Sequence, residues 1–297
     1  MTATATGMSG DRATIAAMGN AIGPDVLAAV QALYGDEQGR IARDLPVAAA
    51  DLSYGDDPRH RIDLYRPVHE SGPAPVLLFV HGGGFVHGEK RSADHPFNAH
   101  VGRWAARHGM VGAVMNYRRA PEHGWPAGGE DVAAAIDWLR DHVACHGGDP
   151  ARIVVMGTSA GAVHVATALM LRAATLDVAA AVLLSGLYGH TPIDVRDALY
   201  YGDPTDYPAR MPREAVTATT LPLFLACAQY DPPRFQRETI GLLAERLERH
   251  GTVTTAAILS AHNHYSLAAH LGTADTRLSD DILGFLADND IIGRETC

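Results

Sequence analysis

The sequence RIVVMGTSAGAVHVATALMLRAA, residues 152–174, decides how the chain is expected to fold. It begins as a short apolar run, which is typical of a buried strand, and continues as a helix-like segment. Between the two lies GTSAG, a Gly-x-Ser-x-Gly sequence, in which Gly157 and Gly161 relieve crowding in a tight strand-to-helix turn. The alternative for the pentapeptide alone is a glycine- and serine-rich helix start without chemistry. Its strand–turn–helix setting instead predicts that Ser159 is a nucleophile at the carboxyl end of a sheet.

Outward from this stretch, strand-like and helix-like segments alternate. Amphipathic segments predict helices at 129–144 and 234–251. Apolar runs predict strands at 47–54, 62–67, 75–80, 110–117, 152–157, 178–186, 221–228 and 252–260. Alternation of this kind is typical of an α/β domain with a mostly parallel central sheet that is flanked by helices.

The sequence HGGGF, residues 81–85, directly follows one of the predicted strands. Three consecutive glycines lose much backbone entropy on folding, so a plain loop rarely carries them. They suit a loop that brings backbone N–H groups close to a ligand oxygen, and we expect an oxyanion hole made by Gly83, Gly84 and Ala160. His81 is expected to shape this loop rather than to act as a base. A phosphate-binding loop is disfavoured because no helix with a Gly-Lys-Ser/Thr start follows.

An acid and a base are expected after the last two predicted strands. Asp231 comes just after the strand at 221–228, and the chain order Ser, Asp, His is the order that this kind of site requires. The stretch SAHNHYS, residues 260–266, offers His262 and His264. We expect His264 to be the base because it lies deeper in the loop at the entry to a helix, with Asp231 fixing its tautomer. His262 is then expected to be a loop or rim residue.

Composition disfavours several other classes of protein. The formal net charge is −10, so no excess of lysine and arginine exists for binding nucleic acid. The three cysteines are far apart, which suggests no disulfide framework and no metal site. No His-Glu-x-x-His sequence occurs, so we predict neither a catalytic metal nor a cofactor. Neither a signal peptide nor an apolar run of membrane-spanning length is evident. We therefore expect a cytoplasmic protein that binds no nucleic acid and no membrane.

Four separated motifs occur in one order: HGGGFVHGEK (81–90), NYRRAPEHGWPAGGEDVAAAIDWL (116–139), GTSAGA, and the Asp and His loops. With these motifs, over about residues 75–270, the chain resembles the hormone-sensitive-lipase-like branch of the α/β-hydrolase superfamily, in its bacterial form. The resemblance implies an α/β-hydrolase fold with a small helical cap. It implies carboxylesterase activity, and it assigns the oxyanion hole to Gly83, Gly84 and Ala160.

The chain departs from that branch in two loops. The acid loop reads YDPPRF (230–235), with Phe235 where many members carry a second acidic residue, and the base loop HNHYS is unlike the commonest form. Both loops look more like those of small bacterial esterases and arylformamidase-like relatives. The resemblance therefore supports the triad and leaves the choice between an ester and an amide substrate open.

The expected organisation is an N-terminal helical cap segment over residues 1–45 and a hydrolase domain over 46–297, with a cap insertion at about 187–215. The expected function is cleavage of small carboxylic esters through an acyl-enzyme, and a homodimer is a possible assembly. Hydrolysis of amides or aryl formamides by the same triad is the first alternative, and a ligand-binding protein without activity is the second. Aromatic residues that could line the substrate pocket, with ordinary core packing as the alternative for each, are Phe85, Trp125, Tyr188 and Tyr265.

Overall fold

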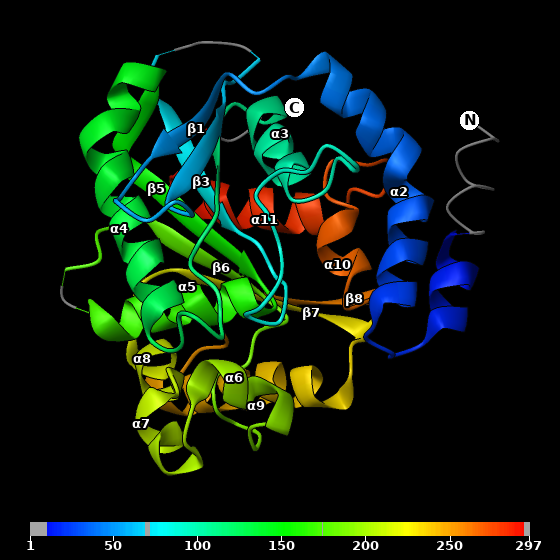
Figure 1. The fold of residues 1–297 in the computed structure, drawn as a ribbon, viewed down its shortest axis with the longest axis vertical. Coiled ribbons are helices and arrows are strands. Elements are labelled where there is room, and N and C mark those ends of the chain that lie inside the picture. The colour runs from blue at the N-terminus through cyan, green and yellow to red at the C-terminus, as the bar shows by residue number, and fades with distance from the viewer. Residues whose placement is uncertain (1–10, 69–71, 174, 294–297) are drawn as a thin grey trace.

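A computed structural model describes residues 11–68, 72–173 and 175–293 (Figure 1). Its centre is an eight-stranded sheet in the order β1-β2-β4-β3-β5-β6-β7-β8. The β1–β2 and β2–β4 pairs are antiparallel and all later pairs are parallel, which confirms the predicted sheet. The strands are β1 Ala49–Ser53, β2 Arg61–Tyr65, β3 Ala74–Val80, β4 Val111–Met115, β5 Gly148–Thr158, β6 Ala180–Leu184, β7 Leu223–Tyr230 and β8 Ala256–Asn263.

Helices cover both faces of the sheet. Ile136 of one helix and Val165 of another lie in the apolar cluster on one face, and Trp104 and Ile282 lie in the cluster on the opposite face. Strand β3 is buried along its whole length between these clusters, which explains its unbroken apolar sequence. The longer helices are α2 Pro24–Asp44, α3 Ala99–Arg107, α4 Ala127–His142, α5 Ala160–Leu171, α9 Pro233–His250 and α11 Arg277–Asp288.

Two features of the secondary structure differ from the sequence prediction. Strand β8 was expected at 252–260, but residues 253–255 precede it without regular structure and it runs on to Asn263. Strand β8 extends to Asn263 because its backbone pairs there with Tyr230 of β7. The residues near this end are polar, so the sequence did not indicate a strand. Helix α3 was not predicted, because glycine and arginine interrupt its apolar residues, and the helix expected after the last strand is divided into α10 (Ser266–Ala269) and α11.

The segment that we expected to form the N-terminal cap packs against the end of the sheet near β8. Residues 11–18 and α2 are helical, and α2 lies beside α10 (Ser266–Ala269; Figure 1). The side-chain amide of Gln38 donates to the carbonyls of Ala269 and Leu271 at 3.0 and 2.8 Å. Residues 1–10 of the expected segment lie outside the described residues.

The expected cap insertion at 187–215 begins after β6 and runs along α9 (Figure 1). It contains the short helices α6 (Ala198–Tyr201) and α7 (Tyr207–Arg210), and it ends in α8 (Arg213–Ala218). The buried carboxylate of Glu238 in α9 fixes its start, because the backbone N–H groups of residues 188–191 donate to Glu238 at 2.7–3.0 Å. No helix in the described ranges is long and apolar enough to cross a bilayer.

Candidate active site

Ser159 occupies the turn between β5 and α5 in a backbone conformation that is strained for a residue with a side chain, at φ 54° and ψ −122°. Its N–H donates to the carbonyl of Leu184 in β6 at 2.8 Å, which holds the turn. A Cβ atom on Gly157 would lie 2.5 Å from the carbonyl carbon of Gly161, and one on Gly161 would lie 2.1 Å from the carbonyl oxygen of Val80. The two glycines therefore permit the close packing that positions Ser159.

Three polar side chains from the carboxyl ends of separate strands form a hydrogen-bonded chain. The Oγ of Ser159 lies 2.9 Å from Nε2 of His264, and Nδ1 of His264 lies 2.7 Å from Oδ1 of Asp231. Asp231 is fully buried and His264 is nearly so. A neutral imidazole donates from Nδ1 to the carboxylate and accepts the serine proton at Nε2, so this geometry suits proton abstraction from the hydroxyl. The structure thus brings together the three residues predicted to be catalytic.

A serine that the sequence analysis missed fixes the other carboxylate oxygen. Oδ2 of Asp231 accepts from the hydroxyl of Ser185 at 2.6 Å and from the N–H of Ala228 at 2.7 Å. Ser185 is fully buried, directly after β6, and has a φ of 47°. The signal in the sequence is a lone polar residue at the end of the apolar run 178–184. These two donors orient the carboxylate so that Oδ1 faces His264.

The glycine loop lies against the nucleophile. A Cβ atom on Gly82 would be 3.2 Å from Cβ of Ser159, and Gly83 and Gly84 have positive φ values of 136° and 57°. The carbonyl oxygen of Gly83 accepts from the N–H groups of residues 86 and 87. These two bonds therefore do not occupy the N–H groups of Gly83 and Gly84. Ala160 is the first residue of α5, where an amide has no intrahelical acceptor. The glycine loop therefore contacts Ser159 through Gly82, and Ala160 directly follows Ser159 in the chain.

His81 has a structural place beneath this loop. Its Nδ1 donates to the carbonyl of Gly82 at 2.7 Å, and its ring stacks on Tyr117 with a centroid distance of 4.5 Å. The Tyr117 hydroxyl donates to the carbonyl of His81 at 2.9 Å. Burial lowers the pKa of His81 to about 4, so the ring is neutral at physiological pH. These contacts agree with a loop-shaping histidine.

His262 is not the rim residue that the sequence suggested, because it is only 1% exposed. It is the second-last residue of strand β8 and lies two residues before His264. Its ring contacts Ser266, Asp275 and Arg277. Strand β8 continues further than its apolar composition indicated. His262 is therefore a buried strand residue and not an exposed residue of the base loop.

A buried aromatic cluster adjoins the nucleophile and the base. It includes the predicted Phe85, which stacks on Tyr200 with a centroid distance of 4.3 Å, and also Ala160 and Tyr201. Phe235 belongs to the same cluster and lies 4.4 Å from the ring of His264. Tyr200 and Tyr201 were not predicted, because the expected cap insertion brings them here from a distant and irregular part of the sequence.

The other three aromatic candidates lie in different places. Trp125 is partly buried against this cluster, and its backbone N–H donates to the carbonyl of Tyr200 at 2.7 Å. Tyr265 packs with the N-terminal helices, and its ring centroid is 5.6 Å from that of His264. Tyr188 is a residue of the apolar core that covers the sheet.

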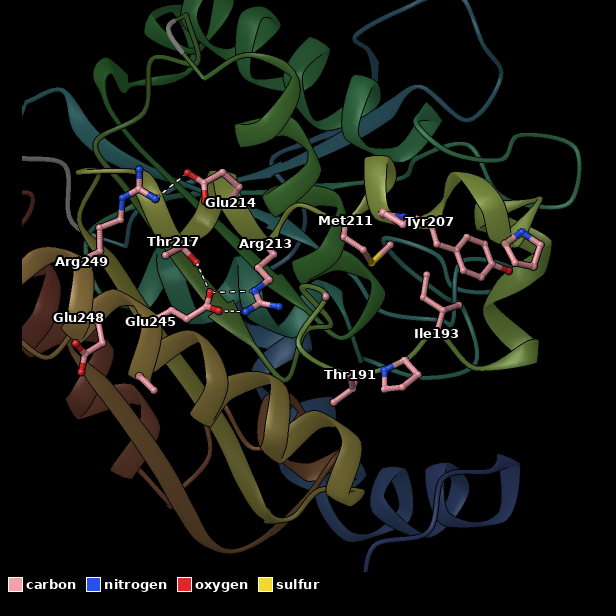
Figure 2. A pocket seen from close by; sticks show the side chains of 15 residues that line it. Thr191, Ile193, Tyr207, Met211, Arg213, Glu214, Thr217, Glu245, Glu248 and Arg249 are labelled. Carbon is pink, nitrogen blue, oxygen red and sulfur yellow. Dashed lines mark hydrogen bonds and ion pairs between the residues drawn. The ribbon is translucent and has the colours of Figure 1, made fainter.

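A separate pocket of about 1110 Å³ lies between the expected cap insertion and α9 (Figure 2). Arg213 and Glu245 face each other across it as an ion pair, and Arg249 pairs with Glu214 at 2.7 Å. Its lining includes none of the three predicted catalytic residues. The hydrogen-bonded chain on Ser159 therefore lies outside this pocket.

Comparisons with known proteins agree with this geometry. Residues 62–184 match the family model described as BD-FAE. The chain is 33% identical over 171 residues to LipM, a probable carboxylic ester hydrolase of Mycobacterium tuberculosis, covering 52% of this chain and 38% of LipM. It is 29% identical over 249 residues to the esterase LipQ of the same organism, covering 74% of this chain and 58% of LipQ. It thus spans less than two thirds of these relatives.

A solved structure of a bacterial heroin esterase resembles almost the whole chain. The two superpose with a TM-score of 0.65 at 26% sequence identity, and the match covers 95% of this chain and 96% of the other. A hyperthermophilic esterase from Pyrobaculum calidifontis superposes with a TM-score of 0.68 at 22% identity, covering 89% and 91%. The second likeness supports the fold alone.

Proposed function

Because the chain belongs to the hormone-sensitive-lipase-like branch of the α/β-hydrolase superfamily, we propose that it is a carboxylesterase of small esters with Ser159 as its nucleophile. The observation that carries this proposal is the hydrogen-bonded chain from Ser159 through His264 to Asp231, at 2.9 and 2.7 Å. Its residues have the proton donor, acceptor and orienting group that acyl transfer needs.

The proposed reaction has two steps. The Oγ of Ser159 attacks the ester carbonyl carbon while Nε2 of His264 takes the hydroxyl proton, and His264 then gives this proton to the leaving alcohol. Water, deprotonated by the same nitrogen, attacks the acyl-enzyme and releases the carboxylic acid and the serine. Asp231 holds the tautomer with a proton on Nδ1 and stabilises the imidazolium that forms in each step.

We assign the stabilisation of the negative charge that develops on the ester carbonyl oxygen to the backbone N–H groups of Gly83, Gly84 and Ala160. Two features support this assignment: the glycine loop approaches Cβ of Ser159, and Ala160 begins a helix whose N-terminus favours negative charge. Donors fixed before the reaction lower the barrier because they need no reorganisation in the transition state.

The aromatic cluster beside Ser159 supports a preference for short acyl groups. Phe85 and Tyr201 are 3% and 1% exposed, so bulky and buried rings already fill space beside the nucleophile. A long acyl chain would have to displace them. We therefore propose acetyl- to butyryl-sized acyl groups as substrates.

Replacing the nucleophile tests the proposal. Ser159→Ala should lower kcat for p-nitrophenyl acetate by roughly 10⁵–10⁶-fold, with an unchanged circular dichroism spectrum. A fluorophosphonate probe read by mass spectrometry should label Ser159 in the native chain and nothing in the variant. Turnover that survives in Ser159→Ala would refute the assignment.

A panel of p-nitrophenyl acetate, butyrate and octanoate beside an aryl formamide separates the candidate substrate classes. We expect kcat/KM to fall from acetate or butyrate to octanoate. A higher kcat/KM for the formamide would favour an amide hydrolase with the same triad over an esterase.

The cytoplasmic location and the homodimer are also proposals. Size-exclusion chromatography of the chain tests the homodimer.

A further inference from the structure

A second cluster of potential ligands lies beneath the base loop. Single ligand atoms of His262, His270 and Asp275 lie within 4.8 Å of one another. The two histidine rings stack with a centroid distance of 4.0 Å. Three chain segments meet here. His262 lies near the end of β8, His270 follows α10, and Asp275 lies in the loop before α11.

His270 presents an unused lone pair to this cluster. Its Nδ1 donates to the carbonyl of Ser266 at 2.7 Å, which leaves the lone pair on Nε2. Nε2 is buried and has no hydrogen-bond partner among the described residues. A neutral imidazole with this tautomer can bind a metal ion through Nε2.

His262 has the same tautomer. The hydroxyl of Ser266 donates to the carbonyl of Asn263, so Nδ1 of His262 donates to Ser266 Oγ at 3.0 Å. Its Nε2 lone pair then faces Asp275 and Arg277, at 3.4 and 3.0 Å. In both histidines a hydrogen bond from Nδ1 orients the ring and directs the Nε2 lone pair into the cluster, as in protein metal sites. The lone pair of His270 has no partner there within the described part of the chain, whereas that of His262 accepts from Arg277, which an ion would have to displace.

Asp275 supplies the charge. Its carboxylate faces the ring of His262, with Oδ2 at 3.4 Å from Nε2. Arg277 bonds to both carboxylate oxygens, at 2.6 and 2.8 Å, and its side chain is 31% exposed. The guanidinium also donates to the carbonyl and the hydroxyl of Ser260, at 2.9 and 3.2 Å, so it keeps partners when another cation takes the carboxylate.

The cluster adjoins a cavity of about 40 Å³ between the N-terminal helices and the base loop. This volume is about that of one bulk water molecule. Asp11, Arg12 and Glu37 line the cavity together with His262 and Asp275. The two carboxylates of Asp11 and Glu37 exceed the single charge of Arg12, so this lining adds net negative charge near a divalent ion.

We propose that His262, His270 and Asp275 bind one divalent transition-metal ion of the Zn²⁺ type, at a site distinct from the triad, and that Arg277 competes with the ion. Two imidazoles and a carboxylate are ligands that Zn²⁺ prefers, with water as a fourth. Tetrahedral ligands at roughly 2.1 Å from zinc lie about 3.4 Å apart, so the three side chains close slightly around the ion. The spacing of these residues matches no short motif, which explains why the sequence analysis found no metal site.

Binding would join β8, α10 and the loop before α11, which enclose the loop that carries His264. The ion would therefore restrict the motion of the base loop without contacting the reacting atoms. The midpoint of thermal unfolding should rise by several degrees when Zn²⁺ exceeds its Kd a hundredfold.

Calorimetric titration of the full chain with ZnCl₂ tests the proposal. We expect one site per chain, with an affinity at least roughly 100-fold lower in His270→Gln and in Asp275→Asn. Arg277→Gln should change the affinity in the opposite direction, by roughly a tenfold gain, because the competing positive charge is gone. The gain-of-affinity variant keeps the test decisive if a ligand variant misfolds by circular dichroism.

Two control variants separate this site from other zinc-binding groups. His264→Ala should bind Zn²⁺ as the native chain does, since the triad is not involved. His142→Gln alters a histidine on the exposed end of α4 and should also leave the affinity unchanged. Loss of binding in either control, or undiminished binding in both His270→Gln and Asp275→Asn, would overturn the proposal. So would a native chain and an Arg277→Gln variant that both fail to bind Zn²⁺.

Discussion

The site on Ser159 and the pocket beside α9 differ in nearly every physical respect. At Ser159, buried polar groups from three strand ends converge within hydrogen-bond distance, and aromatic rings fill the adjacent space. The pocket between the expected cap insertion and α9 has a volume of about 1110 Å³, and ion pairs such as Arg213–Glu245 line it. Empty volume and the convergence of oriented donors and acceptors therefore indicate different places, and our proposal follows the convergence at Ser159.

The largest effect that tests this contrast is expected from Asp231→Asn. An amide at this position can accept from Ser185 and still disturbs the tautomer of His264, so kcat should fall by about 10⁴-fold. Hydrolysis of p-nitrophenyl acetate measures it, and the midpoint of urea unfolding monitors the fold. A decrease of less than tenfold would mean that another group orients His264.

The glycine loop should show an intermediate effect, and it offers a matched pair of variants. Gly83→Ala places a Cβ atom 2.1 Å from the carbonyl oxygen of His87, whereas one on Gly84 meets no atom within 4 Å. We expect Gly83→Ala to lower kcat by roughly 10²–10³-fold through displaced oxyanion donors. Gly84→Ala should cost less than Gly83→Ala in the same assay. The reverse order would show that the loop donates from other positions.

The smallest effect is expected in the large pocket. Arg213→Ala removes an ion pair whose side chains are 48% and 31% exposed, and such pairs contribute less than about 1 kcal/mol. The variant should keep kcat and KM for p-nitrophenyl acetate within about twofold of the native values. A tenfold loss of kcat would erase the contrast, because it would connect the large pocket to the reacting groups.

The sequence predicted the features that depend on local geometry. The strand–turn–helix around Ser159 and the glycines at 82–84 were recognisable because tight turns and close backbone approaches restrict the residue types that fit. Asp231 and His264 followed from chain order. The α/β class followed from the alternation of apolar runs.

Features that depend on contacts between distant segments were not predictable. Ser185, Tyr200 and His270 reach their places only through the order of the strands and the path of the chain between residues 187 and 215. Nothing in the neighbouring sequence marks Tyr200 or His270, and Ser185 is marked only as a lone polar residue after an apolar run. The same holds for the end of β8, which is set by pairing with β7 rather than by composition.

The four N–H groups that converge on Glu238 also have a consequence for engineering. They anchor residues 188–191 to α9, the helix that begins two residues after Asp231. A chimaera whose exchanged segment starts after Thr191 would keep this anchor and leave the acid loop in place, whereas a junction before Tyr188 would remove it. Thr191 is therefore the natural splice point for grafting foreign substrate-covering segments onto this scaffold.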